Sequence, residues 1–524
     1  MLLKLPFKVE TIMRTKLIKL GMLVTIMSLV PTVFAGKKEK AIIERAVEAY
    51  GGDRLLNLKN LKYVDKIDHF FSHQSGHSLQ GATSQHLNQI QIEISLDLEN
   101  HRSEFKRLTK LVVGYHDSRN LTATHRIFKN GTGYNIDHFL EEYQVSDKID
   151  FDNTDPGFSH TLDPLIIKKL ADEKSNIEWL DTAYIQGRAQ EVLTVNADTP
   201  NEYSVYIDRE SGLLSRMLLK RGLHLRTYNF LQHQESDGII WAKQLFVGTE
   251  SSPIYHSRDR HLTINLKDEL SFNIPAYYKE SEPTSPVDVS TLTIRELADG
   301  IFYAGQGWGY TLFIDTGEYY ISAGAWGMSD RSDDWKKALD LLHKTTGNRK
   351  LVKYHLVSHH HTDHMSELND VLDHGAQIII HPTDIKSVTQ FLSERTIKDE
   401  QLKVFNKNTT LADGKVFIFD APNSQASHNL YIYLPEHKIV FAEDIFGSSF
   451  KKQHHSPRSW PHMDTYQRLR SFVNQLKALD LEVKQYVSSH HKRVLDQKDI
   501  DKALETKIPE QQIILKRLFS DREH

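Results

Sequence analysis

Ser358-His359-His360-His361-Thr362-Asp363-His364 is the stretch of this 524-residue chain that decides its fold. It follows the apolar run 351–357, which predicts a buried strand. His359 and His361 are two residues apart, so both imidazoles can leave the strand end towards one ion. Asp363 and His364 lie at the start of the next predicted helix, directly before 365–374, and can face a second ion. Imidazole and carboxylate groups are the ligands that zinc and similar divalent ions prefer, so the stretch predicts a metal site.

Three later residues, His428, Asp444 and His490, are further candidate ligands, because each lies close to its own apolar run. A carboxylate such as Asp444 can give one oxygen to each of two ions, which lie about 3.5–4 Å apart in two-metal sites. Closed structural zinc sites use four ligands, so the larger set favours a catalytic centre. We expect two Zn²⁺, with iron or manganese as alternatives, and a metal-bound hydroxide that attacks a polarised carbonyl or phosphoryl group.

The same motifs resemble those of the metallo-β-lactamase superfamily over about residues 294 to 495. The later stretches Ser427-His428-Asn-Leu-Tyr-Ile-Tyr-Leu-Pro435, Val440-Phe-Ala-Glu-Asp444 and Tyr486-Val-Ser-Ser-His490 carry the resemblance together with the opening cluster. The resemblance implies an α/β fold, an αββα sandwich with the metal site at one edge of its two sheets. It also implies a ligand set: His359, His361 and His428 on the first metal; Asp363, His364 and His490 on the second; Asp444 bridging them.

The chain departs from the family pattern at three places. Ser489 precedes the last histidine where glycine is usual, and the adjoining His491 is a rival for His490. Glu443 stands where a glycine usually precedes the bridging aspartate. The first family motif has an aspartate at a strand end, but here Ser322 takes that position and Asp315 falls in a hairpin turn. Because that aspartate acts behind the ligands, its loss is expected to tune the site without abolishing it.

The amino-acid pattern divides the chain into four parts: a signal peptide at 1–35, a mainly antiparallel β (α+β) domain at 36–280, a polar linker at 281–292 and the catalytic domain at 293–524. Arg14, Lys16 and Lys19 precede the apolar stretch 20–34, and Ala35 ends a cleavage-site pattern. A membrane anchor is the rival interpretation, but about 15 apolar residues are short for a span. We therefore expect a periplasmic or secreted protein.

Alternating strands predominate between 61 and 275, after a predicted helix at 39–50 and interrupted by another at 164–173. The stretch Tyr203-Ser-Val-Tyr-Ile-Asp208-Arg-Glu-Ser-Gly212 and Asp237-Gly-Ile-Ile-Trp241 resemble strands of outer-membrane lipoprotein-carrier domains. That resemblance implies a curved sheet around a helix and a concave apolar surface, which a lipid or lipoprotein could occupy. In the second half, helices are also predicted at 335–344, 465–479 and 500–519.

Composition narrows the classes of partner. Hydrophobic residues make up 39% and charged residues 26%, as in globular proteins, and the net charge of −4 gives no reason to expect nucleic-acid binding. Cysteine is absent, so disulfides and thiolate chemistry are excluded and any metal must use His, Asp or Glu. The expected partner is a small-molecule substrate, and the sequence leaves the oligomeric state open.

The pattern therefore predicts an exported dinuclear hydrolase with Asp363 among its catalytic residues, and the resemblance implies thioesters, lactones or phosphodiesters as its substrates. A mononuclear iron dioxygenase on the same scaffold is an alternative, since the same histidines bind iron. A β-lactamase is less favoured, because β-lactamases of the superfamily generally lack the bridging aspartate. A lipid- or lipoprotein-binding protein is a further alternative. His360, Trp308 and Trp326 are expected to pack beside the site, and four further histidines are candidates for substrate contact: His381, His454, His455 and His462.

Overall fold

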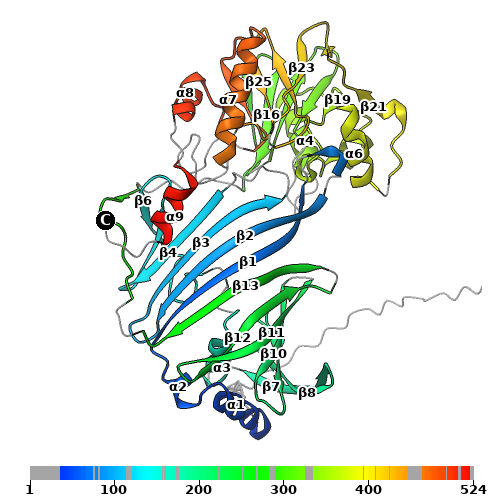
Figure 1. Ribbon diagram of the computed structural model, residues 1–524. Coiled ribbons are helices and arrows are strands. Elements are labelled where there is room, and N and C mark those ends of the chain that lie inside the picture. The colour runs from blue at the N-terminus through cyan, green and yellow to red at the C-terminus, as the bar shows by residue number, and fades with distance from the viewer. Residues whose placement is uncertain are drawn as a thin grey trace, which may run out of the picture.

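The computed structural model describes residues 36–519, except for 75–76, 81–82, 114–120, 156, 158–160, 173–175, 222–223, 251, 267–269, 282–289, 308, 325–333, 394, 408, 424, 447–462, 491 and 506–508. The expected signal peptide and most of the expected linker lie outside these residues. Three sheets make up the strand content of the described chain, with fourteen, seven and five strands (Figure 1).

The first sheet contains every described strand between residues 60 and 280. Its strands are β1 (Asn60–Gln74), β2 (Thr83–Asp97), β3 (Arg102–Val113), β4 (Leu121–Lys129), β5 (Thr132–Asp137), β6 (Glu142–Val145), β7 (Ile177–Ile185), β8 (Arg188–Val195), β9 (Tyr203–Asp208), β10 (Leu214–Arg221), β11 (His224–Ser236), β12 (Ile239–Gly248), β13 (Pro253–Ile264) and β14 (Lys279–Glu280). The spatial order is β14-β6-β5-β4-β3-β2-β1-β13-β12-β11-β10-β9-β8-β7, and only β14 pairs in parallel with its neighbour. The expected antiparallel character of this half is confirmed.

Helices pack against one end of this sheet. They are α1 (Lys37–Ala49), α2 (Asp53–Leu56) and α3 (Asp163–Leu170), near β7 to β12 in Figure 1. The buried residues of α1 recur on one side of the helix, which packs its apolar face onto the core: Ile42, Ile43, Ala46 and Val47. Gly51 follows at φ 117°, and a Cβ there would lie 2.2 Å from the carbonyl oxygen of Gly238. This close approach requires glycine, so α1 ends where the sequence predicts.

The second half forms two facing sheets. The seven-stranded sheet, in the order β15 to β21, contains β15 (Thr293–Ala298), β16 (Ile301–Gln306), β17 (Gly309–Asp315), β18 (Tyr320–Ala323), β19 (Val352–Leu356), β20 (Gln377–Ile380) and β21 (Leu402–Val404). The five-stranded sheet, in the order β22 to β26, contains β22 (Thr410–Leu411), β23 (Val416–Asp420), β24 (Leu430–Leu434), β25 (Ile439–Phe441) and β26 (Gln485–Val487).

Apolar side chains fill the space between these two sheets, and helices cover their outer faces. Leu312 and Ile379 of one sheet share a buried cluster with Ile432 and Val487 of the other. On the outside, α4 (Asp334–Thr346) buries Trp335 against the first of these sheets, and α7 (Met463–Ala478) packs on the second. α5 (Leu368–Asp373) and α6 (Ile385–Phe391) lie beside β20. The expected αββα sandwich is therefore confirmed.

The predicted C-terminal helix at 500–519 is two helices, so that prediction is wrong. α8 (Gln497–Glu505) packs its Ile500 with α7, whereas α9 (Gln511–Phe519) packs Ile514 and Leu518 against β3 and β4 of the first sheet. Pro509 lies between them, and proline cannot continue a helix because its ring clashes with the preceding turn. The predicted helix at 365–374 is also shorter, since regular α-helix begins only at Leu368.

Among the described residues, the first sheet meets elements of the second half at two places. α9 is one of them, and Arg517 there donates to the carbonyl oxygen of His138 at 2.7 Å. The other is the loop between β1 and β2, whose short helix η1 (Ser78–Gln80) lies beside α6. Ser78 is buried; its N–H donates to Oγ of Ser427 at 3.4 Å, and its carbonyl accepts from Ser387 at 3.1 Å. None of the described helices has the length and apolar character that a membrane span requires.

Candidate metal centre

Segments that follow three strands meet at one edge of the sandwich and carry the candidate ligands. β19 leads to His359 and His361, and the short helix η3 (Thr362–His364) follows them. β25 leads to Asp444, and β26 leads to His490. β18, β19 and β20 run parallel to one another, as do β25 and β26. The carboxyl ends of parallel strands share an edge, where ligand sites of α/β folds are usually built.

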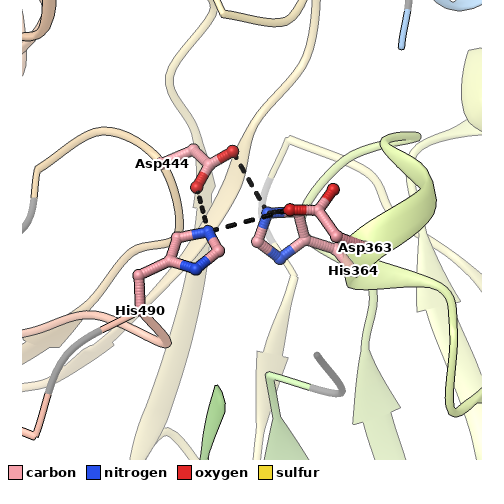
Figure 2. Close-up of side chains that lie close together, drawn as sticks. All are labelled: Asp363, His364, Asp444 and His490. Carbon is pink, nitrogen blue, oxygen red and sulfur yellow. Dashed lines mark ion pairs between the residues drawn. The ribbon is translucent and has the colours of Figure 1, made fainter. Parts of the chain in front are cut away.

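Four of the expected side chains form one compact group: Asp363, His364, Asp444 and His490 (Figure 2). Nε2 of His490 lies 2.5 Å from Oδ1 of Asp444, and Nε2 of His364 lies 3.1 Å from Oδ2 of the same carboxylate. Oδ2 of Asp363 lies 3.6 Å from Nε2 of His364 and 3.9 Å from Nε2 of His490. Asp363 alone is partly open to solvent, with 29% of its side chain exposed. This is the set that the sequence predicts for a second metal.

A second group shares the same aspartate. Nε2 of His359 lies 3.5 Å and Nδ1 of His361 lies 4.0 Å from Oδ2 of Asp444. Atoms of these three side chains are all within 4.8 Å of one another, which is close enough for one ion. All three are buried. The structure thus brings six of the expected residues together, and Asp444 belongs to both groups.

The backbone of Asp444 has φ of 57°, the left-handed region that few residues other than glycine adopt. Gln425 and Arg468 hold this residue: Nε2 of Gln425 donates to Oδ2 of Asp444 at 2.8 Å, and Arg468 donates to the Asp444 carbonyl oxygen. Arg468 also donates to Oε1 of Gln425 at 2.9 Å. Both were missed in the sequence, because a glutamine in a loop and an arginine on α7 match no metal motif.

The structure does not bring His428, the seventh predicted ligand, into either group. Its Nδ1 lies 2.8 Å from Oδ2 of Asp420, and its ring stacks on that of His381 with 3.4 Å between centroids and 12° between planes. Parallel imidazoles direct their nitrogen lone pairs side by side and not to one point. The group His381, Asp420 and His428 is therefore poorly shaped for an ion. The Asp420 contact is instead the kind that orients a histidine for ligation through Nε2. His428 remains a predicted ligand.

Other predicted residues can also be placed. His360 is fully buried with Nδ1 3.5 Å from Oδ1 of Asp384, which agrees with a packing neighbour. Asp315 lies at the turn between β17 and β18, bound to Lys350 at 2.6 Å, as expected of a turn residue. Ser322 is buried and its hydroxyl is 2.8 Å from Nδ1 of His355. The remaining candidates lie outside the described residues: Trp308, Trp326, His454, His455, His462 and His491.

Burial and charge set the protonation of the first group. Burial lowers the pKa of His361 well below its usual value, and the neighbouring His359 and His360 add to this effect. Burial also lowers the pKa of His359, with the charge of His364 acting in the same direction. Neutral imidazole is the form that binds metal, so both histidines are held ready to ligate.

Opposite charges dominate the second group. Burial opposes protonation of His364, but the carboxylates of Asp363, Glu443 and Asp444 raise its pKa well above the usual value. For Asp444 burial acts to raise the pKa, and the charges of His364 and His490 nevertheless hold it well below the usual value. The group is thus a cluster of carboxylates that attracts positive charge, whether a proton or a metal ion.

Several buried atoms of the cluster make no hydrogen bond of acceptable geometry within the described chain, among them Nε2 of His359, Nε2 of His364 and Oδ1 of Asp444. Leaving such an atom unsatisfied costs about 1–3 kcal/mol, so groups like these usually have a partner. Imidazole nitrogens and carboxylate oxygens suit a divalent cation. The residues present therefore fit metal binding.

No family model and no curated protein matches this chain. Solved structures that are similar to it include the DIM-1 metallo-β-lactamase, with 13% identity, 42% of this chain and 98% of that chain covered and a TM-score of 0.32. A metallo-β-lactamase from Pontibacter korlensis has 16% identity, covers 41% and 98% and has a TM-score of 0.32. Rubredoxin oxygen:oxidoreductase from Desulfovibrio gigas has 12% identity, covers 41% and 61% and has a TM-score of 0.33. The fold is assigned from the strand order and layers described above, and the site from its own distances.

Proposed function

We propose that this chain is a metal-dependent hydrolase whose centre holds two divalent ions. The sharing of Asp444 between two groups of ligands carries the proposal: Oδ2 faces His359 and His361 of the first group and His364 of the second, and Oδ1 faces His490 of the second. One carboxylate placed between two sets of imidazoles is the arrangement that a dinuclear site requires. His359, His361 and His428 would hold the first ion, and Asp363, His364 and His490 the second.

Bound divalent ions would supply Lewis acidity, which polarises a carbonyl or phosphoryl oxygen and lowers the pKa of water. The chain's own residues fix where that chemistry can occur. Asp363 has the most exposed side chain of the six that come together, so substrate and water reach the centre on its side. Its Oδ2 faces His364 and His490. Gln425 donates to Oδ2 of Asp444 and Arg468 to its carbonyl oxygen, so the position of this carboxylate is fixed by the chain itself.

The substrate class that we propose is ester-type: a thioester, a lactone or a phosphodiester. The presence of Asp444 supports this choice over a β-lactam, because β-lactamases of the superfamily that the sequence resembles generally lack a bridging aspartate. Export is part of the proposal and is supported by the basic and apolar pattern at residues 14–35.

A mononuclear iron oxygenase is the second candidate, and one observation favours it. His359, His361 and Asp444 by themselves are two histidines and one carboxylate around one point. That donor set is typical of non-haem iron(II) oxygenases. Under this alternative the second group would be occupied by protons, which the raised pKa of His364 permits.

Metal analysis and a substrate screen test the two candidates together. Purified protein is stripped with chelator, reloaded with Zn²⁺, Mn²⁺ or Fe²⁺, and assayed on thioester, lactone, phosphodiester and β-lactam substrates. Two ions per chain and turnover of an ester-type substrate are expected. One iron per chain with oxygen consumption would establish the second candidate, and turnover confined to β-lactams would refute the substrate class.

A further inference from the structure

Glu443 is a buried carboxylate that the proposed ligand set does not use. It lies directly before Asp444 and is only 1% exposed. Within the described chain it has no lysine or arginine at ion-pair distance, and its partner is the imidazole of His364. Burying a carboxylate without a compensating partner is costly, so the contacts that it does make should explain why it is there.

The contacts of Glu443 reach the Nδ1 atoms of two proposed ligand histidines. Oε2 of Glu443 lies 2.9 Å from Nδ1 of His364, an ion-pair contact without the alignment of a hydrogen bond. The same oxygen accepts a hydrogen bond from the hydroxyl of Ser358, and Oγ of Ser358 lies 3.0 Å from Nδ1 of His359. Glu443 therefore reaches His364 directly and His359 through one serine. These two histidines belong to different groups of the centre.

This arrangement favours a proton on Nδ1 of both rings. A carboxylate or hydroxyl oxygen beside Nδ1 stabilises a proton on that nitrogen, and the lone pair of the neutral ring is then on Nε2. Nε2 is the atom of His359 and of His364 that faces Oδ2 of Asp444, at 3.5 Å and 3.1 Å. Outer partners of this kind orient metal-binding histidines, and their loss typically weakens metal affinity 10–100-fold.

The space that Glu443 fills is kept open by a glycine. Gly324 follows β18 with φ of 82°, and a Cβ there would lie 3.1 Å from Oε1 of Glu443 and 2.5 Å from the carbonyl oxygen of Tyr310. No side chain from residue 324 can occupy that space. Ser322, at the strand position where the sequence departs from an expected acid, turns to His355 in the interior instead.

We propose that Glu443 is the positioning residue of both halves of the centre, holding His364 directly and His359 through Ser358 with Nε2 towards Asp444. The carboxylate that orients the ligands thus comes from the segment after β25 in the five-stranded sheet, and not from the end of β18 in the other sheet. This inference rests on the proposed function in one respect, that these histidines bind metal. It does not depend on which substrate is cleaved.

Titration of the metal-free protein with Zn²⁺ and with Co²⁺ tests the proposal, read by competition with a chelator and by the visible spectrum of bound Co²⁺. In Glu443→Ala both ions should bind 10–100-fold more weakly. Glu443→Gln keeps an oxygen that can accept from His364, so it should lose less affinity than Glu443→Ala. Ser358→Ala cuts only the path to His359, so it should weaken the first ion more than the second.

Ser322→Ala is the matched control, because it removes a buried hydroxyl at the neighbouring strand end without touching either ligand. It should bind both ions as the unaltered chain does. Equal affinities in Glu443→Ala and the unaltered chain overturn the proposal, as do equal losses at both ions in Ser358→Ala. A protein that binds both ions but cleaves no ester-type substrate refutes the hydrolase and leaves the role of Glu443 standing.

Discussion

Oδ1 of Asp444 lies 2.5 Å from Nε2 of His490, although the two residues are 46 positions apart in the chain and follow different strands. β25 and β26 run side by side in parallel, so the two residues leave the five-stranded sheet at the same edge. The other oxygen of this carboxylate is shared by His359, His361 and His364. Asp444 is therefore the residue on which both groups depend, and the first prediction concerns it.

Asp444→Asn should disable both halves of the centre at once. The amide keeps the size of the side chain but replaces one oxygen and removes the charge, so we expect fewer than one tightly bound ion per chain. Hydrolysis should fall by more than the roughly 100-fold that loss of an outer partner produces. Metal content by mass spectrometry and initial rates measure this. Asp315→Asn is the control: it changes a turn carboxylate bound to Lys350 and should keep its metal. Two ions retained in Asp444→Asn would refute the shared site.

His428 and His381 offer a comparison between stacked neighbours. If His428 binds the first ion through Nε2, as proposed, His428→Ala should weaken that ion by at least about 10-fold while His381→Ala leaves it nearly unchanged. Both variants lose the same ring stacking, which removes packing as an explanation. Zn²⁺ affinity is the measurement. Equal affinities in the two variants would show that His428 is not a ligand.

Glu367 should make stability depend on pH. Burial, with the charges of Asp370 and Asp334 added, raises the pKa of Glu367 to about 8, whereas an unfolded glutamate titrates near about 4.3. Between these values the unfolded chain loses its proton before the folded chain does. This contribution therefore destabilises the fold progressively as pH rises from about 4 to about 8, and it is constant outside that window.

Glu367→Gln should make stability depend less on pH. Between pH 5 and pH 8 its melting temperature should rise by a few degrees relative to that of the unaltered chain. Glu400→Gln is the control, because that carboxylate is 72% exposed. Melting temperatures are measured at several pH values. The prediction is contradicted if the melting temperature of Glu367→Gln changes with pH in the same way as that of the unaltered chain.

α9 should detach from the first sheet when a charge is placed in its buried face. Ile514 is fully buried against Leu108 and Phe139, whereas the adjacent Ile513 is 44% exposed. Ile514→Asp would bury an unpaired carboxylate, which is strongly unfavourable, so the helix should leave the sheet. Hydrogen exchange of residues 511–519 should become fast in Ile514→Asp and stay slow in Ile513→Asp. Equal protection in both would mean that the helix does not depend on this contact.

Much of the sandwich and of the site could be predicted because the signals are local. The spacing of His359, His361, Asp363 and His364 is fixed by one strand end and one turn, and apolar runs mark the strands before Asp444 and His490. Parallel pairing then brings these ends together without further information from the sequence.

The parts that could not be predicted depend on contacts between distant segments. The sequence marks Glu443 only as a departure from the family pattern, because its role depends on the space left by Gly324, which follows β18 of the other sheet. Gln425 and Arg468 act through hydrogen bonds that no spacing encodes. The C-terminal periodicity continues across Pro509, so a single helix was predicted although the two pieces pack on different sheets.

The contact of Ser78 with Ser427 has a consequence for biosynthesis. These residues are 349 positions apart, so the partner of the β1–β2 loop does not exist until most of the chain has been translated. At about 5–20 residues per second, the wait is roughly 20–70 s. The docking site of α9 on β3 and β4 waits longer still, for residues 511–519. An amino-terminal sheet that folds before the second half of the chain is available would therefore carry two uncovered patches until that half covers them.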